Sequence, residues 1–238
     1  MNHFDYYQYQ AHARGIASKS DVIRKAQEDA FIYERIVRSW LPDDKGARMA
    51  DLACGHGSFL WWLKEQGYSN ARGVDSSPEQ ISLAESAGLV VENADVIEWL
   101  KRQSPNNYQT LFAIDFIEHI SKDDFMIFLS ECQRVLSPNG MLILRYPNGD
   151  SPFVGMNLYN DITHVWTYTT NCINGLASMH RFSSVSFDDQ GISAIRDHRW
   201  IKVPMAKVLD AGLRFVFRSA SREKIKFWNS SIWARIKK

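Results

Sequence analysis

Short apolar runs alternate with amphipathic stretches through the middle of the chain. Five of these runs are predicted to be buried strands, and they begin near Ala47, Arg72, Leu89, Gln109 and Met141. The stretches between them carry apolar residues three or four positions apart, which is typical of helices that pack on a core. Regular alternation of strand and helix favours an α/β fold with a parallel sheet and right-handed crossovers.

The pattern is different at the two ends of the chain. An amphipathic helix is predicted over residues 21–40, ahead of the first strand. After Tyr146 the alternation stops, and residues 147–170 are rich in proline, glycine, asparagine, aspartate and aromatic residues, which predicts a long loop. A further helix is predicted over residues 169–179, followed by strands over residues 182–187 and 230–237.

The first strand leads into a Gly-x-Gly turn that suits a nucleotide ligand. Gly55 and Gly57 let the backbone turn sharply and approach a ligand closely. A dinucleotide site would have a third glycine where Leu60 stands. Asp51, just before the turn, is also a poor neighbour for a pyrophosphate and suits a ligand with a positive group. The turn therefore disfavours a dehydrogenase and favours a different nucleotide cofactor.

Acidic residues follow the next predicted strands at similar positions. Asp75, Asp95 and Asp115 each come at the end of a strand. In open parallel sheets ligands bind beyond the carboxyl ends of the strands, where an acid can accept two hydrogen bonds from ribose hydroxyls. Asp75 is placed for that role, and Asp95 is placed to accept from an exocyclic amine.

Taken in order, these motifs resemble those of the class I S-adenosylmethionine-dependent methyltransferases, over roughly residues 25–150. The matching stretches are DLACGHG (51–57), GVDSS (73–77), NAD (93–95), DFIEHI (115–120) and RVLSPNG (134–140). The resemblance implies a Rossmann-like, seven-stranded, mostly parallel sheet with an antiparallel last strand, flanked by helices. The predicted strands 182–187 and 230–237 would complete that sheet.

The resemblance also implies S-adenosylmethionine as cofactor and assigns roles to its contacts. Gly55 and Gly57 would pass against the methionyl part, Asp75 would hold the ribose, and Asp95 with Val96 would hold the adenine. Ala53 stands where the family more often has glycine. The full cofactor-binding set is Asp51, Ala53, Gly55, Gly57, Asp75, Ser76, Asp95, Val96, Asp115 and Phe116.

One domain is expected to span residues 1–238, since this length buries one good core. Residues 1–45 form an N-terminal helical segment whose aromatic start is either a lid over the cofactor or simply packed on the body. Residues 46–150 form the cofactor-binding core. Residues 151–238 supply the acceptor-side loop, the final strands and a basic C-terminal segment.

Two histidines are candidates for catalysis on the acceptor. His119 follows the fourth strand and His164 lies in the irregular loop after the fifth. A neutral histidine can take the proton that a hydroxyl acceptor loses. A purely structural role near the cofactor loop is the alternative for His119. Glu118, Asp161 and Tyr146 are the candidate acceptor-binding residues.

Two features of the sequence bear on the acceptor: one short motif that is present, and one motif of base-modifying enzymes that is absent. Asp161-Ile162-Thr163-His164, followed by Tyr168-Thr169, resembles methyltransferases of bacterial surface-polysaccharide and sugar modification. That resemblance implies O-methylation of a sugar, a glycan, or a phosphorylated or lipid-linked saccharide. The alternatives are another small molecule, RNA, or a non-catalytic cofactor-binding module. A nucleic-acid acceptor is disfavoured because DFIE at residues 115–118 lacks the Pro-Pro-aromatic element of base-modifying enzymes.

Metal ligands and membrane segments are not evident in the sequence. Asp115, Glu118 and Asp161 can approach one another, but no spaced ligand set is present, so no metal is predicted. Three widely spaced cysteines indicate a reducing compartment. No apolar run reaches the ~20 residues of a membrane span, and the start lacks the features of a signal peptide, so a cytoplasmic location is predicted.

The charge is unevenly distributed. Residues 192–238 hold twelve Lys or Arg and three acidic residues, a net charge of +9 against −8 for the rest of the chain. Such a segment can engage phosphate on an anionic acceptor, or the inner face of the membrane as a peripheral contact. The alternative is a packed helix and strand whose charges are merely solvated. No oligomeric state is predicted.

Overall fold

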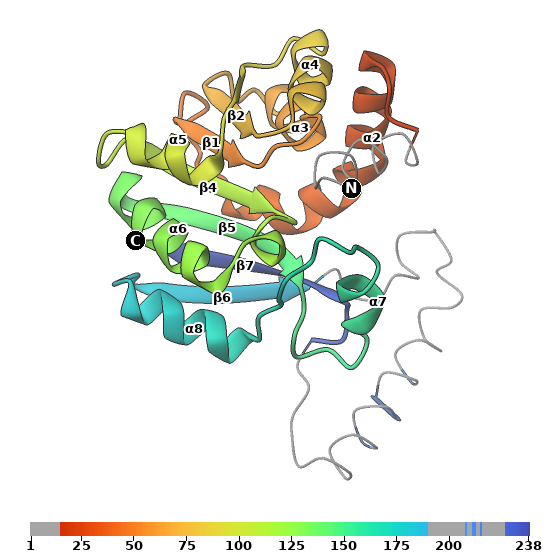
Figure 1. The fold of residues 1–238 in the computed structure, drawn as a ribbon, viewed down its shortest axis with the longest axis vertical. Helices are drawn as coiled ribbons and strands as arrows, with labels where there is room; N and C mark the ends of the chain where they lie inside the picture. The colour runs from red at the N-terminus through yellow and green to blue at the C-terminus, as the bar shows by residue number, and fades with distance from the viewer. Residues whose placement is uncertain (1–14, 190–207, 209–210, 213–214, 216–226) are drawn as a thin grey trace.

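A seven-stranded sheet forms the centre of the molecule (Figure 1). The computed structural model describes residues 15–189, 208, 211–212, 215 and 227–238. The strand order is β3-β2-β1-β4-β5-β7-β6. The predicted N-terminal lid and most of the basic C-terminal segment, with its predicted helix, lie outside the described residues.

Six of the strands run in one direction and β7 runs against them. β1, β2, β3, β4 and β5 pair in parallel, whereas β7 pairs antiparallel with both β5 and β6. This arrangement confirms the predicted class I sheet with its antiparallel last strand. The strands are β1 (Met49–Leu52), β2 (Ala71–Asp75), β3 (Val91–Asn93), β4 (Tyr108–Ile114), β5 (Leu136–Pro147), β6 (Ser184–Asp189) and β7 (Ser231–Lys237).

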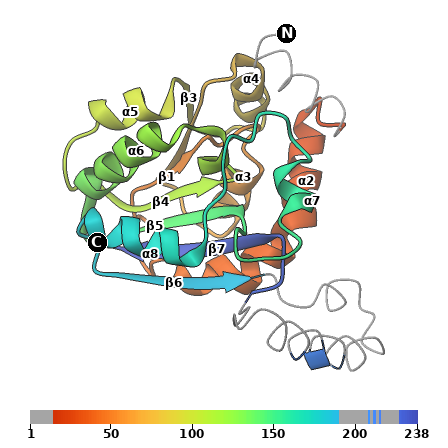
Figure 2. The same cartoon turned by 60° about the horizontal axis from the view of Figure 1, so that its bottom comes forward.

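Helices cover both faces of the sheet (Figure 2), and the alternation of strand residues explains why. In β4, Leu111 and Ala113 belong to the core under α5, α6 and α8, while Phe112 belongs to the core under α2 and α3. Both faces of these strands are therefore buried. The helices are α2 (Lys19–Ile32), α3 (Ser58–Glu65), α4 (Pro78–Ser86), α5 (Val96–Arg102), α6 (Lys122–Val135), α7 (Gly155–Leu158) and α8 (Thr170–Met179).

Helix starts agree with the local sequence signals. Ser77 caps α4, its side chain accepting from the backbone N–H of Gln80, and Pro78 occupies the first turn. Ser121 caps α6 in the same way, accepting from the N–H of Asp124 at 3.0 Å. These caps fix where the helices leave the carboxyl edge of the sheet.

Several predicted boundaries were wrong. The helix predicted over residues 21–40 is α-helical only to Ile32 and continues as a π-helical turn, Tyr33–Val37, and a 3-10 turn, Arg38–Trp40. β5 begins at Leu136 rather than near Met141, because residues 137–140 form a bulge within the strand. Asn139 has a φ of 63° there, and the pairing shifts between Tyr108 and Thr110.

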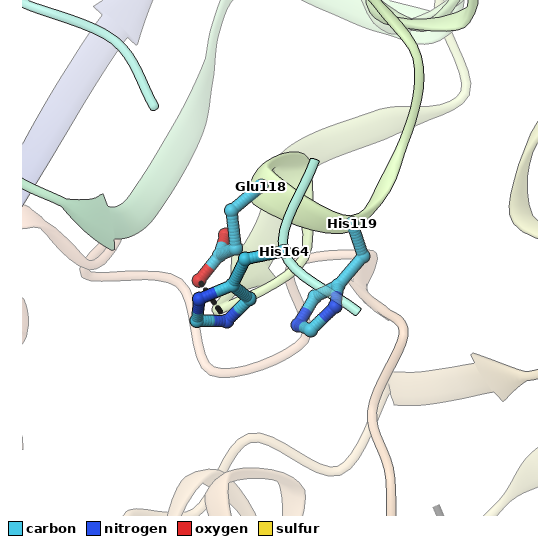
Figure 3. A group of neighbouring side chains, drawn as sticks. All are labelled: Glu118, His119 and His164. Carbon is cyan, nitrogen blue, oxygen red and sulfur yellow. Dashed lines mark ion pairs between the residues drawn. The ribbon is translucent and has the colours of Figure 1, made fainter. Parts of the chain in front are cut away.

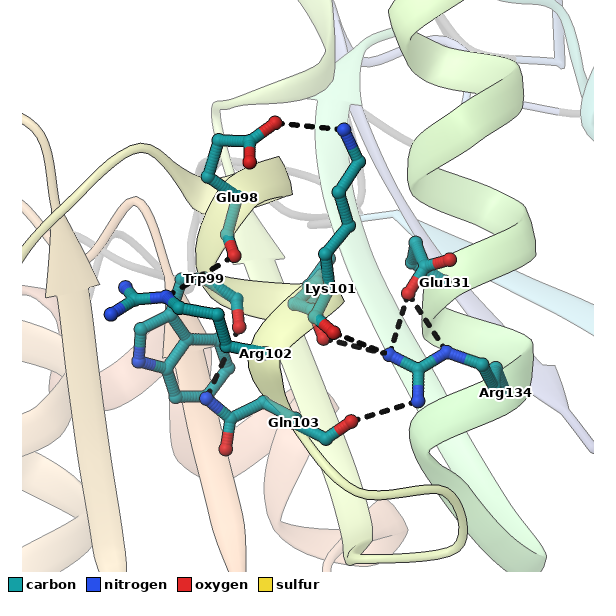
Figure 4. Close-up of polar contacts among 8 residues, drawn as sticks. Glu98, Trp99, Lys101, Arg102, Gln103, Glu131 and Arg134 are labelled. Carbon is teal, nitrogen blue, oxygen red and sulfur yellow. Dashed lines mark hydrogen bonds and ion pairs between the residues drawn. The ribbon is translucent and has the colours of Figure 1, made fainter.

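Arg134 fastens α5 to α6 (Figure 4). Its guanidinium donates to the carboxylate of Glu131 at 2.6 Å and to the backbone carbonyls of Leu100 and Gln103 at 2.9 and 2.8 Å. Leu100 lies in the last turn of α5, where its carbonyl also accepts from the N–H of Gln103 at 2.9 Å, and Gln103 directly follows the helix. Arg134 therefore fixes the approach of the chain to β4, which carries candidate active-site residues at its far end.

Candidate active site

The predicted site residues gather at the carboxyl edge of the sheet because of the strand order. β1 lies between β2 and β4, and all three run in parallel. Asp51 within β1, Asp75 at the end of β2 and Asp115 just after β4 therefore share one edge. This is where ligands bind in sheets of this kind.

The turn between β1 and α3 depends on left-handed backbone conformations. Ala53, Gly55 and Gly57 have φ values of 63°, 51° and 82°. A Cβ on Gly57 would lie 2.4 Å from a methyl carbon of Leu89 and 3.1 Å from Cβ of Ala84. Gly57 thus lets the turn lie directly against α4. The φ of Ala53 also gives a reason why glycine is common there, since a side chain costs roughly 1 kcal/mol in this region.

Gly57→Ala is expected to lower the free energy of unfolding by about 2–4 kcal/mol, from the left-handed backbone and the crowding against α4. Gly55→Ala is the matched control. It shares the positive φ, but its Cβ would meet nothing closer than 3.8 Å, so we expect a loss of only about 1 kcal/mol. Urea unfolding of both variants measures the difference, and equal losses would contradict the crowding argument.

Asp75 joins the end of β2 to the glycine turn. Its Oδ2 accepts from the backbone N–H of Gly55 at 2.8 Å and its Oδ1 accepts from the N–H of Ser77 at 2.9 Å. Burial raises the pKa of Asp75, and these N–H groups oppose that shift. Each carboxylate oxygen has a second lone pair. The side chain can therefore accept from two ribose hydroxyls without giving up either backbone contact.

Asp51 is a buried acid with an unsatisfied oxygen. Its side chain is 2% exposed, and its Oδ1 has no hydrogen-bond partner among the described residues. Burial, and after it the neighbouring Asp75, raises the pKa of Asp51. A buried acceptor without a partner is costly. A ligand ammonium or N–H group at this edge would satisfy it, so the residue fits the amino-acid end of S-adenosylmethionine.

The residues predicted to hold the adenine lie beside Asp75, which is predicted to hold the ribose. Ala94 donates its N–H to the backbone carbonyl of Asp75 at 3.0 Å, which holds the end of β3 against β2. Asp95 caps α5 and is exposed, Val96 behind it is buried, and Ser76 is exposed. The start of α5, with Asp95 and Val96, therefore lies next to the end of β2, where Asp75 is the last strand residue and Ser76 follows it.

Asp115 has a partner that sequence reasoning missed. Arg145 of β5 donates to Asp115 Oδ2 at 2.6 Å, and Asp115 itself has a φ of 53°. The only sequence signal was a lone arginine inside an apolar strand. Next to it, Phe116 packs against Phe128 of α6, with ring centroids 5.5 Å apart. The charge of Asp115 is thus already paired with the guanidinium of Arg145 before any ligand binds.

Glu118, His119 and His164 form one group (Figure 3). Glu118 and His119 lie on the 3-10 turn Ile117–His119 that follows β4, and His164 lies on the loop between α7 and α8. The two imidazole centroids are 4.6 Å apart, and Nε2 of His164 is 4.0 Å from Oε1 of Glu118. The backbone carbonyl of Glu118 accepts from the N–H of Val165 at 2.7 Å, which fixes the loop on the turn.

Hydrogen bonds orient both imidazoles in the same way. His164 Nδ1 lies 3.0 Å from the carbonyl of Leu158, so Nδ1 must donate. The hydroxyl of Thr163 donates to Asp161 at 2.6 Å and therefore accepts from Nδ1 of His119 at 2.9 Å. Burial, and after it His164, lowers the pKa of His119 to about 4, so this ring is neutral at pH 7.

The three candidate acceptor-binding residues have different surroundings. Glu118 belongs to the histidine group, and Asp161 reaches it through Thr163. Tyr146 is fully buried and packs edge-on against Tyr168, 6.5 Å between centroids. Tyr146 thus lies within the core. Both faces of β5 are buried, so the pattern of apolar residues along this strand could not show whether Tyr146 faces the core or the acceptor site.

The family of the chain is established by its sequence match. Residues 23–198 match the profile of a family described as a methyltransferase domain. The chain belongs to this methyltransferase family. The match spans β1 to β6 and the whole carboxyl edge just described. It confirms the predicted enzyme class, a methyltransferase dependent on S-adenosylmethionine, whose sulfonium supplies the methyl group when it is bound.

Solved structures share the fold of this methyltransferase. A SAM-dependent methyltransferase from Archaeoglobus fulgidus is 22% identical with a TM-score of 0.67, covering 88% of this chain and 94% of its own. A Mesorhizobium loti S-adenosylmethionine-dependent methyltransferase is 16% identical with a TM-score of 0.60, covering 87% and 97%. Haemonchus contortus phosphoethanolamine N-methyltransferase 2, solved with S-adenosylmethionine, is 17% identical with a TM-score of 0.60, covering 86% and 51%.

The comparisons establish the fold and the reaction class, but they do not identify the acceptor. No curated protein matches the chain in sequence. Among the described residues, no helix is both long and apolar enough to cross a membrane. The acceptor must therefore be argued from the side chains around His119 and His164.

Proposed function

We propose that this methyltransferase transfers the methyl group to a hydroxyl oxygen of a sugar, a glycan, or a phosphorylated or lipid-linked saccharide, in bacterial surface-polysaccharide biosynthesis. The observation that carries the proposal is the group formed by Glu118, His119 and His164. It follows β4 directly and so lies next to the edge that carries Asp51 and Asp75.

The chemistry of a hydroxyl acceptor explains why such a group is useful. Methyl transfer replaces the hydroxyl proton with the methyl group, so one proton leaves the acceptor oxygen while the sulfonium becomes a neutral thioether. A neutral amine acceptor already has a lone pair and needs no such help. Both imidazoles donate from Nδ1 into the protein, which leaves Nε2 as the basic atom of each ring. His119 and His164 are therefore suited to activate a hydroxyl.

The loop that carries His164 offers a surface for an amphipathic acceptor. Large apolar side chains of this loop, of α7 and of the turn before α7 are exposed, and the backbone of Val165 in this loop bonds to Glu118 of the candidate site. Aromatic and aliphatic surface of this kind binds the apolar faces of sugar rings or an acyl chain. The exposed residues are Phe153, Met156, Tyr159, Ile162, Val165 and Trp166.

Positive charge near this apolar surface is a second feature that bears on the acceptor. Lys122 Nζ lies 3.6 Å from the ring centroid of Trp166 and so adds positive charge to the same surface. This supports a phosphorylated or lipid-linked saccharide over a neutral one. The basic segment over residues 192–238 would add to it, either at the phosphate or at an anionic membrane surface, as a cytoplasmic peripheral contact.

Incubation with methyl-labelled S-adenosylmethionine and separate acceptors tests the proposal. The panel holds nucleotide sugars, lipid-linked saccharides, free glycans, phospholipids, small amines and RNA. We expect label in a saccharide, on an ether oxygen located by mass spectrometry. Label confined to RNA or to an amine would overturn the acceptor class. Cofactor binding without transfer to any member would favour the non-catalytic module.

A further inference from the structure

We propose that Glu118, His119 and His164 hold a divalent metal cation. One ligand atom from each residue lies within 4.8 Å of the other two. Two imidazoles and one carboxylate form a ligand set that leaves positions open for a further oxygen, and it suits divalent Mn, Fe or Zn. Ligands about 2.1 Å from one cation are at most about 4.2 Å apart. Small side-chain rotations would therefore close the group around an ion.

The hydrogen bonds around the two rings favour this role. A metal-binding histidine commonly donates its other ring N–H to a carbonyl or, directly or through another group, to a carboxylate. His164 donates from Nδ1 to the carbonyl of Leu158, and His119 donates from Nδ1 to Thr163, which in turn donates to Asp161. Both rings therefore direct Nε2, the atom that coordinates, away from these partners.

The carboxylate of Glu118 is only partly compensated by the described residues. It is 1% exposed, and its Oε2 has no hydrogen-bond partner among the described residues. The nearby cation, Arg145, is bonded to Asp115 at 2.6 Å. A buried carboxylate is costly unless a charge or hydrogen bonds offset it. A cation between Glu118 and the imidazoles would supply that charge.

The group is also held in place before any ligand arrives. The N–H of Val165 donates to the carbonyl of Glu118 at 2.7 Å. This backbone hydrogen bond joins the loop beside His164 to the turn that carries Glu118 and His119. The hydroxyl and N–H of Thr163, next to His164, both contact Asp161. Ordering of the loop therefore does not have to be driven by the ion.

The inference refines the proposed function at one point. A cation that binds the acceptor hydroxyl makes it more acidic and fixes its position. The proton then leaves to water, and His164 acts as a ligand instead of taking the proton itself. Cation binding can be measured without any acceptor, so its failure would leave the acceptor class untouched.

Mn²⁺ is the probe for the experiment. The protein is treated with chelator, desalted and titrated with Mn²⁺, and free Mn²⁺ is followed by electron paramagnetic resonance. We expect one ion per chain, with binding weakened at least tenfold in Glu118→Gln and in His164→Ala. Thr163→Val removes the hydroxyl that accepts from His119 and donates to Asp161, while all three ligands stay in place, and we expect a loss of roughly 10- to 100-fold. Thr163 is a positioning residue in this scheme.

Controls separate the site from adventitious binding and from misfolding. Glu98→Gln and His180→Ala change an exposed carboxylate and a histidine bonded to Ser130, outside the group, and both are expected to bind as the unmodified protein does. Binding of S-adenosylhomocysteine checks the fold of each variant. Absence of Mn²⁺ binding, or equal affinity in all the variants, would overturn the proposal and restore direct proton transfer to His164.

Discussion

Asp75→Ala is expected to weaken the binding of S-adenosylmethionine by at least about 100-fold. Hydrogen bonds to a charged group contribute roughly 1.5–3 kcal/mol each, and the carboxylate can accept two from the ribose. Tenfold in affinity corresponds to about 1.4 kcal/mol, so losing both bonds gives an effect of this size. Calorimetric titration with S-adenosylhomocysteine measures it without turnover.

Part of that loss would come through the protein. Asp75 also accepts from the backbone of Gly55 and of Ser77, so its removal loosens the glycine turn. Asp44→Ala is a matched control, because Asp44 likewise accepts from a loop N–H, that of Gly46 at 2.8 Å, in an exposed loop that precedes β1. We expect that variant to bind normally. An affinity within threefold of the unmodified protein for Asp75→Ala would refute the ribose assignment.

The backbone of the candidate cofactor edge could be predicted because its signals are local. The turn at Gly55 and Gly57 and the caps at Ser77 and Ser121 each depend on a few neighbouring residues. The order of acids along the chain then becomes an order in space, since parallel strands bring their carboxyl ends to one edge. Asp75 and Asp95 needed no tertiary information to be placed.

The acceptor side could not be predicted in the same way. Arg145 and Asp115 are 30 positions apart, and His119 and Thr163 are 44 positions apart. The first contact depends on the register between β4 and β5, and the second depends on how the loop after β5 folds back over the end of β4. No periodic pattern in the sequence encodes either of these. For the same reason, the sequence could not predict that Glu118 and His164 lie together as potential metal ligands, or that Tyr146 is buried against Tyr168.

Boundary errors have a related cause. The π-helical turn at Tyr33–Val37 lies where Tyr33 packs among Phe59, Trp62 and Trp233. Tertiary packing there overrides the regular helical period that the sequence suggests. The bulge in β5 likewise reflects pairing with β4, because a Cβ on Gly140 would lie 3.1 Å from the carbonyl of Gln109 in β4 as well as 2.8 Å from that of Ser137.

His164→Ala is expected to lower kcat by about 100- to 10,000-fold, the range that one proton-transfer group contributes. A comparable loss follows if the ring holds a cation, since either role acts on the acceptor hydroxyl. The cofactor contacts assigned here come from β1, β2 and the turns that follow β3 and β4, so the affinity for S-adenosylhomocysteine should change by less than about twofold. Single-turnover transfer to the saccharide identified in the acceptor panel measures the rate.

The comparison with His180→Ala makes that result specific. His180 follows α8 and bonds to Ser130 of α6, so its removal also deletes an imidazole from a hydrogen bond. We expect this variant to transfer at the unmodified rate. Normal turnover by His164→Ala would show that the ring neither accepts a proton nor binds an ion. A slow rate combined with lost cofactor binding would instead show that the loop supports the cofactor edge, because the two effects are separable only if His164 acts on the acceptor alone.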